Sequence, residues 1–242
     1  MICYGLLQAQ LSRTHYIPPI TAAANNNSLP LNQYLHISTP SISPVNVELN
    51  QLGGIVLNYI VSNSSPVEVF IGSGDNTSFV VPSFDTASQI NNKGYVVNSE
   101  KPVYVSVRLT GGNQNQAGSL VSKGLSGLGK TFRVGTFTNL KIFSAGDQDY
   151  INFVSVMATE NNTQVDFSDL PVDVIIENNT PLSTVLDAGE SYVVALNPAE
   201  TTSNTDGLIG ALVNSNKPIV VNCGSFNGSN SNGYGRDAGI DQ

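Results

Sequence analysis

The chain has 242 residues and a formal net charge of -8; 40% of its residues are hydrophobic and only 12% are charged. Its ten basic residues are scattered, which argues against a nucleic-acid partner, because phosphate binding requires clusters of Lys and Arg. No run of eighteen apolar residues occurs, so no membrane-spanning helix is expected.

Residues 1–10 are interpreted as the remnant of a secretory signal peptide. They contain a short apolar stretch followed by a small residue and Gln, without the basic start of a complete signal. Export is therefore expected. Of the two cysteines, Cys3 lies in this segment and Cys223 occupies an alternating apolar position, so neither a disulfide framework nor a thiolate metal cluster is expected.

Residues 11–32 are predicted to form an extended lead-in, because the adjacent prolines Pro18 and Pro19 disfavour regular structure. Residues 33–112 and 149–242 are each predicted to form a unit of β-strands, since β-branched and aromatic residues alternate with polar ones between Gly-, Asn- and Ser-rich turns. The predicted strands are residues 34–38, 45–49, 55–61, 67–71 and 79–81 in the first unit, and 150–157, 163–167, 172–176, 183–186, 191–196, 208–213 and 219–223 in the second.

One stretch of sequence occurs twice. Residues 97–107 and 213–223 are 116 positions apart and share six of eleven residues, including an Asn-Ser-x-Lys-Pro segment. The same shift relates two further pairs: Gly94 with Gly210, and Tyr34 with Tyr150. Because Pro has no N–H donor, each copy is interpreted as a hairpin-like corner between two β runs. The sequence therefore predicts an all-β protein of two tandem β-sandwich-like repeat units.

Residues 113–148 are predicted to be a Gly/Ser-rich connector with a short helical turn within residues 119–128 and a strand at residues 131–137. The connector contains a formal match to the phosphate-binding loop G-x-x-x-x-G-K-[ST], formed by Gly124, Gly129, Lys130 and Thr131. That loop requires a following helix whose N-terminus meets the phosphates, whereas the residues after Thr131 alternate like a strand. The match is interpreted as coincidental, and no cofactor is expected.

No catalytic residue and no metal site is predicted. His15 lies in the lead-in, and His36 is expected to be a polar, surface-facing residue of a strand, so neither is assigned as a catalytic base. Asp147 and Asp149, in the turn before the second unit, are the candidate calcium ligands, because Asp-x-Asp supplies two carboxylates. The rest of a calcium-binding loop is missing around them, and a solvated turn is the favoured interpretation.

Several motifs together resemble the N-terminal domain of the IgGFc-binding protein family. They are residues 15–19 (His-Tyr-Ile-Pro-Pro), 99–103 (Ser-Glu-Lys-Pro-Val), 118–124, 153–163 and 217–225. The version they look like stands at the front of large secreted Bacteroidetes proteins that carry a gliding-motility or type IX secretion sorting domain. The resemblance spans residues 11–242 and implies an extracellular, β-rich module of an adhesin-like surface protein, with no catalytic residues to carry over.

The leading hypothesis is a non-catalytic adhesion or structural binding module at the cell surface, whose ligand is a protein or a glycan. Binding is expected at the loops at the ends of the units, where polar turns gather on a rigid scaffold. A glycan-binding module attached to a secreted enzyme or adhesin is the first alternative. A hydrolase is the second alternative, and it would need a cleft with convergent carboxylates.

Overall fold

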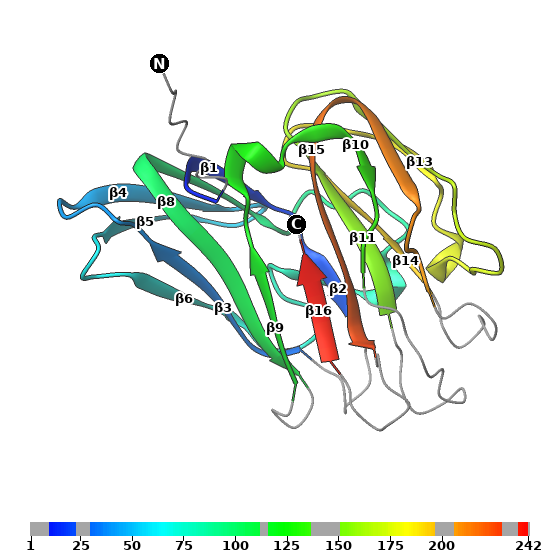
Figure 1. Cartoon of the computed structure of the whole chain (residues 1–242), viewed down its shortest axis with the longest axis horizontal. Helices are drawn as coiled ribbons and strands as arrows, with labels where there is room; N and C mark the ends of the chain where they lie inside the picture. Colours follow the sequence, from blue (N-terminus) through cyan, green and yellow to red (C-terminus); the bar gives the residue numbers. More distant parts are fainter. Residues whose placement is uncertain are drawn as a thin grey trace, which may run out of the picture.

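The computed structural model describes residues 10–22, 30–111, 116–136, 151–196, 206–228 and 237–241. In these residues every regular element is a β-strand or a short 3-10 turn (Figure 1). The strands form two sheets of seven strands each and one sheet of two strands. The all-β prediction is therefore confirmed.

The first sheet is built around one long strand, β8. Its main order is β5 (Val56–Val61), β4 (Val45–Gln51), β8 (Tyr95–Gly111), β3 (Pro30–Ser38) and β6 (Val67–Gly72), and β1 (Ser12–Ile17) and β9 (Gln116–Val121) also pair with β8. The first part of β8 pairs with β1 and β4, and its second part pairs with β3 and β9. A single strand thus belongs to both layers, and the sheet curls over its own core.

The second sheet repeats this arrangement strand for strand. Its order is β13 (Ser183–Leu186), β12 (Thr163–Ser168), β15 (Leu212–Gly228), β11 (Ile151–Ala158) and β14 (Ser191–Ala195), and β10 (Gly129–Arg133) and β16 (Asp237–Asp241) also pair with β15. We call β1 to β9 the first unit and β10 to β16 the second unit. The prediction of two β-sandwich-like units is confirmed.

The duplicated Lys-Pro segment is a bend inside a strand, so the predicted hairpin-like corner was wrong. β8 runs without interruption through Pro102, and β15 runs through Pro218. Pairing with β4 ends at Ser99 and pairing with β3 begins at Tyr104. Proline fits between these ladders because it has no N–H to donate to either of them.

Both bends are held by equivalent contacts. The hydroxyl of Thr39 donates a hydrogen bond to the carbonyl of Pro102 at 3.0 Å, and the hydroxyl of Thr159 donates to the carbonyl of Pro218 at 2.7 Å. The two lysines reach the same loops as these threonines: Lys101 contacts Ser43, and Lys217 contacts the carbonyl of Asn161. The repeat therefore extends from sequence to side-chain contacts.

Strand register corrects one predicted equivalence. Tyr34 pairs with Arg108, and Gly224, which lies 116 positions after Arg108, pairs with Phe153. Tyr34 therefore corresponds to Phe153, which is 119 positions later, and not to Tyr150. A single shift fails because the segments between the strands differ in length in the two units.

Other predicted elements differ locally. β1 lies in the predicted lead-in and β9 in the predicted connector, but both pair with β8. Pro18 follows β1 directly, so the prolines end this strand and do not prevent it. The predicted strand at residues 172–176 is irregular: it begins with a turn at 172–173, and only Ile176 forms a β-bridge, to Leu196. The predicted helical turn is limited to the 3-10 turn η2 (Gly124–Gly127).

The two units share a core. The short strand β2 (Ile20–Ala22) pairs in parallel with β7 (Val80–Pro82) and packs against β11, β14 and β15 of the second unit (Figure 1). Phe153, Val193 and Ala195 of the second sheet accordingly belong to the hydrophobic core of the first unit. The opposite face of the second sheet forms a second core, which includes Val154 and Val156.

Candidate functional site

The residues of the formal phosphate-loop match do not form a loop before a helix. Gly124 lies in the turn η2, and Gly129, Lys130 and Thr131 lie in the strand β10. The carbonyl of Lys130 accepts a hydrogen bond from Ser215, just as the carbonyl of Arg13 in β1 accepts one from Ser99. Residues 124–136 are all described and contain no α-helix, so this segment offers no helix N-terminus to a phosphate.

His15 is a buried structural residue. Its Nδ1 lies 3.0 Å from the hydroxyl oxygen of Ser122, and its Nε2 lies 3.0 Å from the carbonyl oxygen of Val103. With the proton on Nε2, the ring donates to the carbonyl and accepts from Ser122, so a neutral imidazole links β1 to β8 and to the end of β9. Burial away from water lowers the pKa of His15.

The candidate calcium ligands Asp147 and Asp149 lie outside the described residues. Among the residues that the structure does describe, no group of three or more His, Cys, Asp or Glu side chains could hold a metal ion. Cys223 is half-buried and packs against the second core. In the same part of the chain, no helix is long and apolar enough to cross a membrane.

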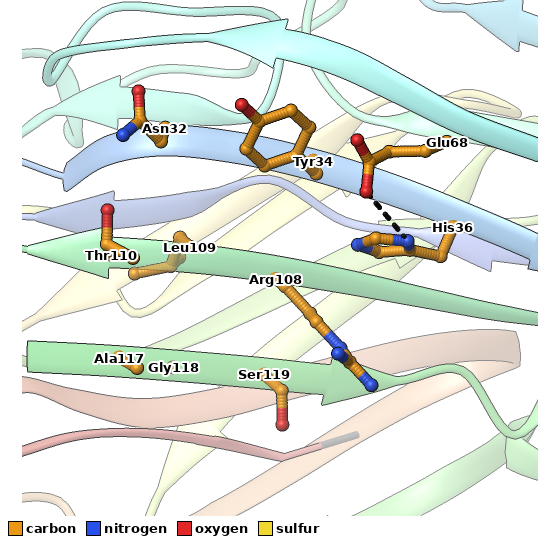
Figure 2. A pocket seen from close by; sticks show the side chains of 10 residues that line it. All are labelled: Asn32, Tyr34, His36, Glu68, Arg108, Leu109, Thr110, Ala117, Gly118 and Ser119. Carbon is orange, nitrogen blue, oxygen red and sulfur yellow. Dashed lines mark ion pairs between the residues drawn. The ribbon is translucent and has the colours of Figure 1, made fainter.

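A hollow of about 520 Å³ lies on the outer face of β6, β3, β8 and β9 (Figure 2). The side chains around it point outward because strand residues alternate between the two faces of a sheet. Leu35 and Ile37 point into the core, and Tyr34 and His36 point outward. The residues that line it are Asn32, Tyr34, His36, Glu68, Arg108, Leu109, Thr110, Ala117, Gly118 and Ser119.

Strand register places the side chains in and beside the hollow in two neighbouring rows. The first row runs across four strands, through Phe70, Tyr34, Arg108 and Ser119. The second row contains Glu68, His36, Ser106 and Val121. We call the outward side chains of Tyr34, His36, Glu68, Phe70, Arg108 and Ser119 the open face.

The open face combines aromatic rings with charged groups. The rings of Tyr34 and Phe70 lie 5.3 Å apart between centroids, and Phe70 is 58% exposed. His36 Nδ1 lies 3.6 Å from a carboxylate oxygen of Glu68. Arg108 is exposed and extends toward β9 (Figure 2), and its guanidinium forms no ion pair with any side chain that the structure describes.

The equivalent face of the second unit is covered. The counterparts of Tyr34, His36, Glu68 and Phe70 are Phe153, Ser155, Val193 and Ala195, and all four are buried. Asn222, the counterpart of Ser106, donates a buried hydrogen bond from its side-chain amide to the carbonyl of Pro18 at 2.9 Å. We call these second-unit residues the covered face, because residues 18–22 lie across it.

Part of this site was predictable from the sequence. The outward position of His36 was predicted and is confirmed, but Tyr34, Phe70 and Arg108 were not predicted as site residues. Their only signal in the sequence is their position on the polar phase of alternating strands. The hollow also lies on a sheet face, whereas binding was expected at the end loops.

The comparisons with known proteins give one match. A search of curated proteins finds no similar sequence, and a search of solved structures finds no similar structure. A comparison with protein families matches residues 117–242, from β9 to β16, to the family described as IgGFc binding protein. This match covers more than half of the chain. The chain therefore belongs to the IgGFc binding protein family.

Proposed function

We propose that the chain is a non-catalytic module that binds a protein ligand through the open face of its first unit. The family description supports binding of a protein. The observation that carries the choice of surface is the contrast between the repeats: residues 18–22 lie across one face, and its counterpart is a hollow, lined by Tyr34 and Arg108, across which no described segment lies.

The residue types of the open face suit protein recognition. Tyrosine and arginine are enriched among the residues that dominate binding energies, and exposed aromatic rings supply large contact areas. The surrounding sheet holds these side chains on a rigid surface, so little entropy is lost when a ligand binds. Glu68 supplies the only carboxylate among the described residues that line the hollow, which supports a binding role over a pair of catalytic carboxylates.

The first probe is the Fc fragment of immunoglobulin G, because the family description names it. We expect saturable binding by calorimetry that weakens at least about tenfold in Phe70→Ala, since hot-spot aromatics contribute about 2 kcal/mol or more. Val185→Ala is the matched control, because Val185 is also an exposed apolar strand residue, 51% accessible, in the second unit. An equal loss of affinity in both variants would exclude the open face as the binding surface. The absence of saturable binding would exclude Fc as the ligand.

A glycan-binding module is the second candidate function. The pair formed by half-buried Tyr34 and exposed Phe70 favours it, because aromatic faces stack on sugar rings. The absence of Trp from the sequence weakens it. If the chain binds glycans on an array and Phe70→Ala abolishes this binding, the ligand of the open face is a carbohydrate and not a protein.

We also propose that the module acts outside the cell, in a larger secreted adhesin-like protein of the kind found in Bacteroidetes. This proposal is supported by the low content of charged residues and by the motifs that resemble those secreted proteins. Digestion of intact cells with an external protease tests it. Loss of the protein from intact cells is expected, and full protection would contradict a surface location.

A further inference from the structure

We infer that the ligand of the open face is an extended acidic peptide. Its carboxylate pairs with Arg108, and a neighbouring apolar side chain of the peptide packs on Tyr34 and Phe70. This inference rests on the proposed function and adds the chemistry of the ligand.

The covered face shows what this surface of the repeat accommodates. Residues 18–22 lie across it in an extended conformation: Ile20–Ala22 form β2, and the carbonyl of Pro18 accepts the hydrogen bond from Asn222. β2 contacts β11, β14 and β15, which are the counterparts of β3, β6 and β8. In one repeat, therefore, the outer sheet face receives an extended piece of chain that is recognised partly through its backbone.

The side chains of the two faces differ where charge is concerned. Arg108 of the open face corresponds to Gly224 in the second unit, and Glu68 corresponds to Val193 of the covered face. Glu68 lies beside His36, whereas the guanidinium of Arg108 has no charged partner among the side chains that the structure describes. A planar guanidinium binds a carboxylate through two parallel hydrogen bonds, so an Asp or Glu of the ligand completes this position.

The spacing of the first row fits an extended peptide. Neighbouring strands lie about 4.8 Å apart, so Tyr34 is one strand spacing and Phe70 two strand spacings from Arg108. In an extended peptide, side chains on the same side recur about every 6.8 Å, which is every second residue. An acidic residue over Arg108 therefore places the side chain of the residue two positions away on top of the rings of Tyr34 and Phe70.

The net charge of -8 opposes an acidic ligand only at long range. At physiological ionic strength, charges separated by more than about 8 Å are largely screened. The ion pair at Arg108 then decides the local energy, and the overall charge mainly slows association. The carboxylate is expected at the Arg108 side of the hollow, away from Glu68.

The test selects ligands from a random library of 12-residue peptides displayed on phage, with the full chain as bait. We expect enriched peptides to carry Asp or Glu two positions from an apolar or aromatic residue. Arg108→Ala should weaken a selected synthetic peptide at least tenfold in calorimetry, because charge-assisted hydrogen bonds are lost. Lys130→Ala, which makes the same change in net charge on the exposed strand β10, should leave affinity unchanged.

A double-mutant cycle identifies the contact itself. Replacing the acidic residue of the peptide by its amide should weaken binding to the unmodified chain but not to Arg108→Ala. The inference is overturned if selection enriches no peptide, if the acidic residue is dispensable, or if only carboxylated glycans bind. A peptide that loses affinity in Phe70→Ala but not in Arg108→Ala would overturn the inference and leave the proposed function standing.

Discussion

At the scale of single residues, buried polar side chains tie the strands of the first unit together. His15 is the clearest case, because its neutral ring joins the carbonyl of Val103 to the hydroxyl of Ser122 and is fully buried. Protonation of the ring would bury a positive charge. It would also turn Nδ1, which now accepts a hydrogen bond from Ser122, into a donor. Protonation of His15 is therefore expected to destabilise the fold.

The free energy of unfolding is predicted to fall as the pH drops below about 6.5, the ordinary pKa of histidine. Burial lowers the pKa of His15 in the folded state, so the unfolded chain takes up the proton first and acid favours unfolding. The stabilisation is present above pH 6.5 and is lost toward the lower folded pKa. Urea unfolding between pH 7.5 and 5 should show this loss, and His15→Gln should reduce it; an unchanged pH dependence in that variant would contradict the assignment.

Gly94 and Gly210 provide a second prediction at the residue scale. Both adopt positive φ, 97° and 89°, so alanine is strained at either position by about 1 kcal/mol or more. A Cβ at Gly94 would lie 2.8 Å from the carbonyl oxygen of Ile17, whereas a Cβ at Gly210 would meet nothing within 4 Å. Gly94→Ala should therefore destabilise the chain more than Gly210→Ala in urea unfolding. A larger loss of stability in Gly210→Ala than in Gly94→Ala would contradict the close approach of the Ile17 carbonyl to Gly94.

At the scale of elements, the long strands β8 and β15 determine the architecture, because each joins the two layers of its unit through a bend at a Lys-Pro pair. The alternation of Val103, Val105 and Val107 made the second half of β8 predictable from sequence. The continuity of the strand was not predictable, since Asn, Ser and Pro usually mark turns. Here the same residues separate two ladders, and proline is tolerated because neither ladder needs its donor.

The hydrogen bonds to the two bends give a prediction for these elements. Thr39→Val and Thr159→Val should each lower the free energy of unfolding by about 1 kcal/mol, because each removes one hydroxyl-to-carbonyl hydrogen bond of similar geometry. Thr131→Val, at an exposed strand position, is the control and should have little effect. Denaturant unfolding measures all three, and equal effects at the three positions would show that the bends are not held by these bonds.

At the scale of the whole molecule, the two units are expected to unfold together, because Phe153 of the second sheet is buried in the core of the first. Phe153→Ala should destabilise the chain by about 3–5 kcal/mol. Calorimetry should show one heat-absorption peak that moves by roughly 10 °C, given about 2–4 °C per kcal/mol for a chain of this size. Two separate peaks, of which the substitution moves one, would contradict a shared core.

The candidate site also belongs to this scale, which explains why the sequence alone did not reveal it. Tyr34, Phe70 and Arg108 are dispersed along the chain and become neighbours only through strand register. The contrast between the faces depends on residues 18–22, which lie more than one hundred residues before the strands that they cover. Periodicity can show which residues point outward, but it cannot show which of two equivalent faces another segment will cover.

Thiol labelling tests the contrast between the faces most directly. In a chain whose Cys3 and Cys223 are replaced by serine, His36→Cys and Ser155→Cys place one thiol at equivalent positions of the open and covered faces. Ser155 is fully buried and His36 is partly exposed. We predict rapid labelling at position 36 and labelling at position 155 only as fast as the chain unfolds. Equal rapid labelling at both positions would contradict the account.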